Sequence, residues 1–200
     1  TQSLERVVAD VAAGASRIRV GPPLEPSTEM GPIANARQFA KVTGMVARAL
    51  ASGARLAGGG GAPPGLPAGG FWLAPTLLSG VAPETEIAQE EVFGPVLAAM
   101  PFADEAEAVR LANATRFGLA GAVWSRDVGR AHRVAASLRA GTVWVNGYRT
   151  IHVAVPFGGF AASGHGRSSG AEALAAYTRP KAVWIETAEQ PAVTFGYAPA

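Results

Sequence analysis

The feature that most constrains the fold is an alternation of apolar runs and amphipathic segments between residues 94 and 146. Three apolar runs predict buried strands, over 95–100, 119–124 and 142–146. The segments between them predict two helices. One begins at Asp104, with Glu107 three residues later as in a capping box, and the other begins at Asp127. Short links between such elements are typical of a parallel open sheet with helices on both faces, so the sequence predicts an α/β fold.

The flanking sequence predicts further elements and a tail. Helical periodicity predicts helices over 3–16, 34–52 and 170–177, and shorter apolar runs predict strands over 17–20, 55–57 and 181–186. Gly-rich segments over 58–70 and 157–170 predict loops. We therefore expect one domain over 1–185 and a tail over 186–200, in which alternating Val193, Phe195 and Tyr197 predict either an edge strand that pairs with another subunit or a disordered end.

Composition excludes several kinds of chemistry. The 200 residues contain no Cys, which excludes a disulfide, a thiolate zinc site, an iron–sulfur cluster and a Cys nucleophile within this chain. The three His residues lack metal-ligand spacing, so we expect no metal site. A net charge of +2 argues against a nucleic-acid partner. There is no apolar run of about 18 residues and no targeting pattern, so we expect a cytoplasmic protein without a membrane partner.

Two polar sites stand next to predicted strands. Glu90 and Glu91 precede Phe93 and a Gly-Pro bend that leads into the first strand, and they form either a solvated acidic turn or part of a site near the sheet edge. Asn146 ends the third strand, where it either caps the strand or lines a ligand crevice at the carboxyl edge of the sheet. The segments 58–61 and 164–166 are Gly-rich but lack the other residues of a phosphate-binding loop or a dinucleotide fingerprint.

Five motifs follow one another in an order that resembles the NAD(P)-dependent aldehyde dehydrogenases. They are Glu90-Glu91-Val92-Phe93-Gly94-Pro95-Val96, Phe117-Gly118-Leu119-Ala120, Gly141-Thr142-Val143-Trp144-Val145-Asn146, Pro156-Phe157-Gly158-Gly159 with Ser163-Gly164-His165-Gly166-Arg167, and Tyr177 with Lys181. Met30-Gly31-Pro32 is similar to the family's loop before its second helix. The resemblance covers roughly residues 3–185 and implies a catalytic domain of the aldehyde dehydrogenase type.

The resemblance implies an oxidation of an aldehyde to a carboxylic acid. In this family a Cys thiolate attacks the carbonyl, a hydride passes to the nicotinamide of NAD or NADP, and a Glu-activated water releases the acyl group. The nucleophile, the general base and the cofactor domain are expected upstream of Thr1 in a longer parent protein. The catalytic groups are therefore expected outside this chain, so the isolated chain is expected to be inactive. The parent is expected to form a homo-oligomer.

Residue by residue, the resemblance implies two groups of site residues. Glu91 is similar to the family carboxylate that holds the nicotinamide ribose hydroxyls, and Phe93 resembles the aromatic residue beside the nicotinamide. Arg149, Ile151 and Phe157 fall in or beside the loop over 147–155, which resembles the family's substrate-lining loop. Ile151 and Phe157 suit an apolar aldehyde. Arg149 either favours an acidic aldehyde or is a surface residue.

Two departures and two alternatives accompany the resemblance. Ala161 stands where the family usually has Lys, and Ser168 stands where it usually has Glu, which affects local loop packing. The absence of a nucleophile leaves a free-standing, non-enzymatic association domain as an alternative. A CoA-acylating or acyl-phosphate-reducing relative is a further alternative within the same superfamily.

Overall fold

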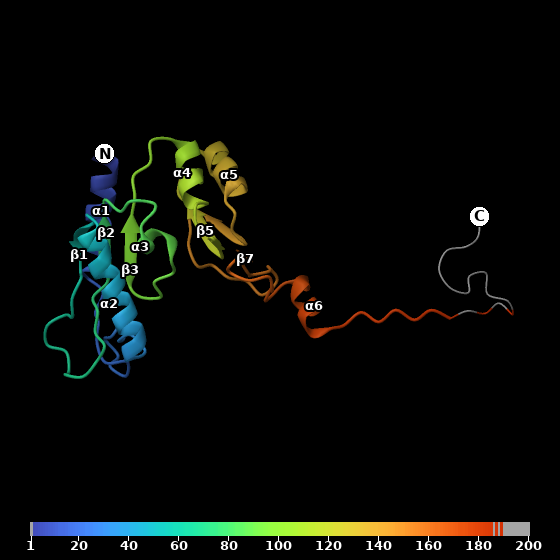
Figure 1. Ribbon diagram of the computed structural model, residues 1–200, viewed down its shortest axis with the longest axis horizontal. Helices are drawn as coiled ribbons and strands as arrows, with labels where there is room; N and C mark the ends of the chain where they lie inside the picture. The colour runs from blue at the N-terminus through green and yellow to red at the C-terminus, as the bar shows by residue number, and fades with distance from the viewer. Residues whose placement is uncertain (1, 186, 188, 190–200) are drawn as a thin grey trace.

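A computed structural model describes residues 2–185, 187 and 189 (Figure 1). The helices are α1 (Gln2–Ala15), α2 (Ala36–Ala51), α3 (Glu86–Gln89), α4 (Glu105–Ala112), α5 (Val128–Ser137) and α6 (Leu174–Tyr177), with a 3₁₀ turn at Ala171–Ala173. The strands are β1 (Arg55–Gly58), β2 (Thr76–Ser79), β3 (Val96–Ala99), β4 (Phe117–Gly118), β5 (Ala120–Val123), β6 (Thr142–Val145) and β7 (Phe160–Ala161). The predicted α/β fold is confirmed.

The strands of the described residues form three separate sheets, one mixed, one parallel and one antiparallel, which corrects the prediction of one parallel sheet. β1 pairs antiparallel with β2, β2 pairs parallel with β3, β5 pairs parallel with β6, and β4 pairs antiparallel with β7. β3 and β5 are not hydrogen-bonded to each other, although α4 connects them. A strand–helix–strand pattern predicts a crossover, but it does not require the two strands to be neighbours in a sheet.

The main core lies where α2 packs against β2. Four apolar residues of α2 are buried, and the core cluster joins three of them to Leu78, Val81 and Ile87. All four residues of β2 are buried, and because successive strand residues point to opposite faces, both faces of β2 are covered. Helix α1 contacts β1 and β2. The sheet β1–β2–β3 is thus enclosed at its centre.

The helix-start signals in the sequence are confirmed. Asp104 caps α4, where its Oδ1 accepts a hydrogen bond from the backbone N–H of Glu107 at 2.8 Å. The Glu107 carboxylate accepts in return from the N–H of Ala103 at 2.8 Å. Asp127 caps α5 through the N–H of Arg130 at 3.0 Å. That bond is the main reason why the pKa of Asp127 lies below its usual value.

Several predicted elements are wrong. The strand predicted over 17–20 is reduced to one isolated bridge between Val20 and Met30, because the prolines that follow cannot extend a ladder. Residues 181–185 of the strand predicted over 181–186 are irregular and exposed. Their apolar side chains have no sheet to join within the described residues, and Figure 1 shows this segment running away from the rest of the chain. Glu186 and the predicted tail strand with Val193, Phe195 and Tyr197 lie outside the described residues.

The core predicts a large effect of truncating Leu78, whose side chain is fully buried. Leu78→Ala is expected to lower the free energy of unfolding of the chain by about 2–5 kcal/mol, since it removes buried methyl groups and leaves a cavity. Leu24→Ala is the matched control, because Leu24 is 97% exposed. Urea unfolding followed by circular dichroism measures both changes. Similar losses in the two variants would contradict this account of the core.

Candidate functional site

The turn over Glu90–Phe93 links α3 to β3 and holds the first two predicted site residues. Glu90 is the C-cap of α3, and Phe93 has φ +53°. A left-handed conformation is uncommon for a bulky residue and costs about 1–3 kcal/mol, so it persists only where the surroundings fix it. The Phe93 side chain is 74% exposed, so burial of its own ring does not provide that support.

Helix α2 supports the turn through two polar side chains. The Gln38 side-chain Nε2 donates to the carbonyl oxygens of Val92 and Phe93, both at 2.8 Å. Lys41 lies one turn further along the helix, and its Nζ donates to the carbonyl oxygen of Glu91 at 2.6 Å. The same ammonium group lies 5.7 Å from the centre of the Phe93 ring. Three consecutive carbonyls of the turn are therefore bound to one helix.

Gly94 brings the turn into direct contact with the core. A Cβ atom at this position would lie 2.7 and 2.8 Å from the two Cγ atoms of Val42, which is fully buried on α2. Only a residue without a side chain allows the backbone to approach the helix this closely. The position of the turn is thus set by core packing as well as by hydrogen bonds.

Arg116 fixes the other side of the turn. Its Nη2 donates to the Glu90 carboxylate at 2.8 Å, and the guanidinium group lies 4.7 Å from the centre of the Phe117 ring. The bond to Glu90 raises the pKa of Arg116. Glu90 is exposed, as the reading of a solvated acidic turn predicts. The negative charge of Glu90 is paired with Arg116, so this carboxylate is already occupied.

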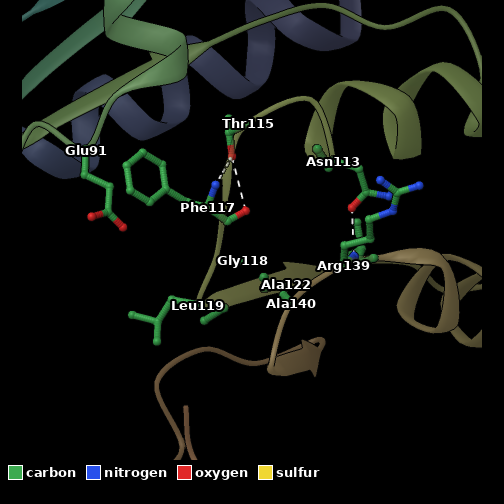
Figure 2. A pocket seen from close by; sticks show the side chains of 13 residues that line it. Glu91, Asn113, Thr115, Phe117, Gly118, Leu119, Ala122, Arg139 and Ala140 are labelled. Atoms are coloured by element: carbon green, nitrogen blue, oxygen red, sulfur yellow. Dashed lines mark hydrogen bonds between the residues drawn. The ribbon is translucent and has the colours of Figure 1, made fainter. Parts of the chain in front are cut away.

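Glu91 has a different environment, in a hollow of about 250 Å³. The hollow is lined by the end of α4, by β4 and β5, and by the residues that lead into β6: Glu91, Ala112, Asn113, Thr115, Phe117, Gly118, Leu119, Ala120, Gly121, Ala122, Leu138, Arg139 and Ala140. Figure 2 shows Glu91 and Phe117 on one side, with Asn113 and Arg139 on the other. Gly and Ala residues supply much of the lining, so space is left for a ligand.

The Glu91 carboxylate is half-buried and accepts no hydrogen bond or ion pair from the part of the chain that the structure describes. A carboxylate has two acceptor oxygens and forms strong bonds with two adjacent hydroxyl groups. The fixed backbone and the open oxygens therefore suit a ligand that presents a diol, such as a ribose.

Asn113 fixes the far side of the hollow. Its Nδ2 donates to the carbonyl oxygen of Ser137 at 2.8 Å. Its Oδ1 accepts from the N–H of Arg139 at 2.7 Å, as Figure 2 shows. These bonds join the end of α4 to the segment between α5 and β6. The wall opposite Glu91 is therefore held by one side-chain amide.

The Asn146 side chain forms hydrogen bonds with the backbone, which favours the strand-capping alternative. Its Oδ1 accepts from the N–H of Ser125 and its Nδ2 donates to the carbonyl oxygen of Ser125, both at 2.9 Å. The amide thus joins the ends of β5 and β6, and φ +51° at Asn146 turns the chain into the loop over 147–155.

The predicted substrate residues lie on this loop and just after it. Arg149 and Ile151 are exposed, and Phe157 is half-buried. Trp144 of β6 anchors the loop, because its Nε1 donates to the carbonyl oxygen of Thr150 at 2.8 Å. Phe157 is fixed by paired backbone bonds with Ser168 at 2.7 and 2.8 Å. Of the five predicted site residues only Glu91 lines the hollow, and the roles of all five stay predictions.

Three residues of the site were missed by sequence reasoning: Gln38, Lys41 and Arg116. The sequence contains one usable signal, because Asn35 and Gln38 have capping-box spacing at the start of α2. Asn35 does cap the helix, accepting from the N–H of Gln38 at 2.9 Å. The Gln38 side chain, however, binds carbonyls 54 and 55 residues away. Only the tertiary structure reveals such a contact.

No helix of the described residues is long and apolar enough to cross a membrane. Within the same part of the chain, no group of three or more His, Asp or Glu residues is placed to hold a metal ion.

Comparison with known proteins identifies close relatives. The model of the aldehyde dehydrogenase family matches residues 1–183. Betaine aldehyde dehydrogenase of Mesorhizobium japonicum is 44% identical over 187 residues, which is 92% of this chain and 38% of that protein. Betaine aldehyde dehydrogenase of Brucella anthropi is 43% identical over 184 residues, 91% of this chain and 38% of that protein. The chain thus spans about 38% of the length of these curated relatives.

Solved structures of aldehyde dehydrogenases are also similar to this chain. An aldehyde dehydrogenase from Burkholderia cenocepacia, described as putative, matches with a TM-score of 0.83 and 42% identity, over 91% of this chain and 37% of that one. The NAD⁺ complex of an aldehyde dehydrogenase from Bacillus cereus matches with a TM-score of 0.86 and 36% identity, over 92% of this chain and 37% of that one.

The close approach of Gly94 to Val42 predicts that any side chain at position 94 destabilises the fold. Gly94→Ala is expected to lower the free energy of unfolding by about 1–3 kcal/mol, because the added methyl group collides with Val42 and the core must shift. Gly61→Ala is the control, since a Cβ atom there meets nothing within 4 Å and Gly61 has no positive φ. Urea unfolding compares the two variants. A Gly94→Ala protein as stable as Gly61→Ala would contradict the proposed packing.

Proposed function

Because the chain belongs to the aldehyde dehydrogenase family, we propose that the whole protein oxidises an aldehyde to a carboxylic acid with NAD⁺ or NADP⁺. In this proposal residues 1–185 form part of the catalytic domain and hold the nicotinamide end of the cofactor. The named relatives are dehydrogenases, which favours an enzyme over the alternative of a non-enzymatic association domain.

The observation that carries the cofactor role is the Glu91 carboxylate on its fixed turn. Glu91 lines a hollow and its carboxylate accepts no bond from the described residues, so the two oxygens are available to two ribose hydroxyls. When bound, the nicotinamide accepts a hydride from the substrate. Glu91 and the exposed ring of Phe93 would orient that end of the cofactor, and the rigid turn would limit its position. Orientation of this kind is a large part of what a protein contributes to a reaction between two bound molecules.

The bond-making groups are proposed to come from elsewhere in the whole protein. These 200 residues contain no Cys, so they supply no thiolate nucleophile, and Glu91 is assigned to binding and not to general-base work. The tail over 186–200, the homo-oligomer and the cytoplasmic location stay predictions.

For the substrate, we propose an aldehyde whose chain contacts Ile151 and Phe157. The relatives are named betaine aldehyde dehydrogenases, so betaine aldehyde is the first substrate to test. Arg149 is exposed at φ +60° and is proposed to be a surface residue.

Glu91→Gln tests the cofactor role in the whole protein. The variant is expected to slow NADH formation in a single turnover by about ten- to a hundredfold, because an amide holds the ribose hydroxyls less firmly and the nicotinamide is less well oriented. The dissociation constant of the cofactor is expected to change by less than about threefold, since the rest of the cofactor is bound elsewhere.

Stopped-flow absorbance measures the rate, and fluorescence titration measures cofactor binding. Glu84→Gln is the control, because Glu84 is an exposed carboxylate just before α3 and does not line the hollow. An unchanged single-turnover rate in Glu91→Gln would remove Glu91 from the proposed site.

A separate test uses the 200-residue chain by itself. The purified 200-residue chain is expected to form no NADH or NADPH from betaine aldehyde or from other aldehydes, because it has no Cys nucleophile. The whole protein is the positive control in the same absorbance assay. Turnover by the purified chain would show that its own residues suffice for the reaction.

A further inference from the structure

The loop over 147–155 carries two of the predicted substrate residues and is joined to the sheet by one strand side chain. Resting on the proposed contact between Ile151 and the aldehyde, we infer that Trp144 of β6 is a positioning residue that sets the aldehyde preference. In this role Trp144 acts through the backbone of Thr150 and does not itself contact the substrate. The class of substrate that this arrangement selects is an aldehyde whose apolar chain extends from the carbonyl as far as Ile151.

The Trp144 indole reaches from the sheet to the middle of the loop. Its Nε1 donates to the carbonyl oxygen of Thr150 at 2.8 Å, and this carbonyl belongs to the peptide unit that leads into Ile151. Within the described residues the stretch 147–151 makes no other hydrogen bond. The orientation of the peptide between Thr150 and Ile151, and with it the direction of the Ile151 side chain, therefore depends on this one hydrogen bond.

Two residues of this region have left-handed backbone conformations that need support. The φ angle is +51° at Asn146 and +60° at Arg149, and such conformations persist in residues with a side chain only where the surroundings fix them. Asn146 is held by its side-chain bonds to the backbone just after β5. Arg149 is exposed, so the adjacent bond from Trp144 to Thr150 is its main support. Without that bond Arg149 is expected to relax toward a negative φ and to shift the residues that follow it.

Trp144 is itself fixed by the sheet and by the start of the loop. Its backbone lies in β6, opposite Ala122 of the parallel strand β5, and its side chain is half-buried. The Tyr148 ring packs edge-on against the indole, with 5.4 Å between the ring centres and 73° between the ring planes. This edge-to-face arrangement is favourable for aromatic pairs. A side chain held in this way on a strand positions a site more accurately than a side chain on a loop.

The side chain that the hydrogen bond positions is apolar and faces solvent. Ile151 is 62% exposed, so packing within the described residues does not set its position. An apolar side chain in a substrate pocket distinguishes aldehydes by the length of chain that it covers, roughly tenfold for each methylene group. A shift of Ile151 is therefore expected to change the preference for long over short aldehydes and to leave the position of the reacting carbonyl unchanged.

The test uses the whole protein and compares kcat/KM for hexanal with kcat/KM for acetaldehyde, whose methyl group is not expected to reach Ile151. Trp144→Phe keeps an aromatic ring beside Tyr148 but has no N–H donor. It is expected to lower kcat/KM for hexanal by about tenfold, mainly through a higher KM, and that for acetaldehyde by less than about twofold. The melting temperature is expected to change little. Trp124→Phe is the matched control, because Trp124 is 65% exposed just after β5, and it is expected to keep the wild-type preference.

Ile151→Ala separates this inference from the proposed function. If Ile151 contacts the aldehyde, Ile151→Ala is expected to lose the preference for hexanal. Trp144→Phe combined with Ile151→Ala is then expected to resemble Ile151→Ala alone, because the two changes act on one contact. A wild-type preference in Trp144→Phe beside a lost preference in Ile151→Ala would overturn the positioning role, as would an equal loss of kcat/KM for both aldehydes. A wild-type preference in Ile151→Ala would instead overturn the proposed substrate contact, so the two failures are distinguishable.

Discussion

The burial of one face of helix α2 is the interaction on which the described structure depends. Met45, Val46 and Ala49 are nearly inaccessible and pack against β2 and the segment that follows it, and the buried Val42 lies beside Gly94. This packing removes apolar area from water and fixes the helix relative to the sheet. The same helix presents Gln38 and Lys41 to the Glu90–Phe93 turn, so the position of the candidate site follows from the core.

The second structural theme is the use of single polar side chains to join separate backbone segments. Asn113 joins the end of α4 to the approach to β6, and Asn146 joins the ends of β5 and β6. Gln38 does the same between α2 and the turn. Each amide satisfies backbone groups that have no partner in a helix or a sheet, which buried or half-buried loops require. Around the candidate site these bonds replace the regular ladders that hold the core.

Much of the fold could be predicted because the relevant signals are local. The caps at Asp104 and Asp127 and the periodicity of α1, α2, α4 and α5 depend on residues three or four positions apart. Strand β2 was missed, although all four residues of Thr76–Ser79 are buried, because the polar Thr76 and Ser79 interrupt the apolar run and only the tertiary structure buries them. The strand predicted over 181–186 is a different case, because residues 181–185 have the apolar pattern but are irregular. Its apolar residues are suitable for a strand, but a strand forms only beside a partner, and residues 181–185 have none among the described elements.

The candidate site likewise contains residues that a local motif indicates and residues that only the tertiary structure reveals. Glu91 and Phe93 could be proposed from a motif, because their neighbours are contiguous in the chain, and their roles stay predictions. Gln38, Lys41 and Arg116 could not, since they reach the turn from 26 to 55 residues away.

The sequence by itself determined the α/β class, the approximate bounds of α1, α2, α4 and α5, and the absence of a Cys nucleophile in these 200 residues. Only the tertiary structure decided which strands pair and which side chains fix the turn. Periodicity and capping are properties of neighbouring residues, whereas strand order and long-range hydrogen bonds depend on how distant segments pack together.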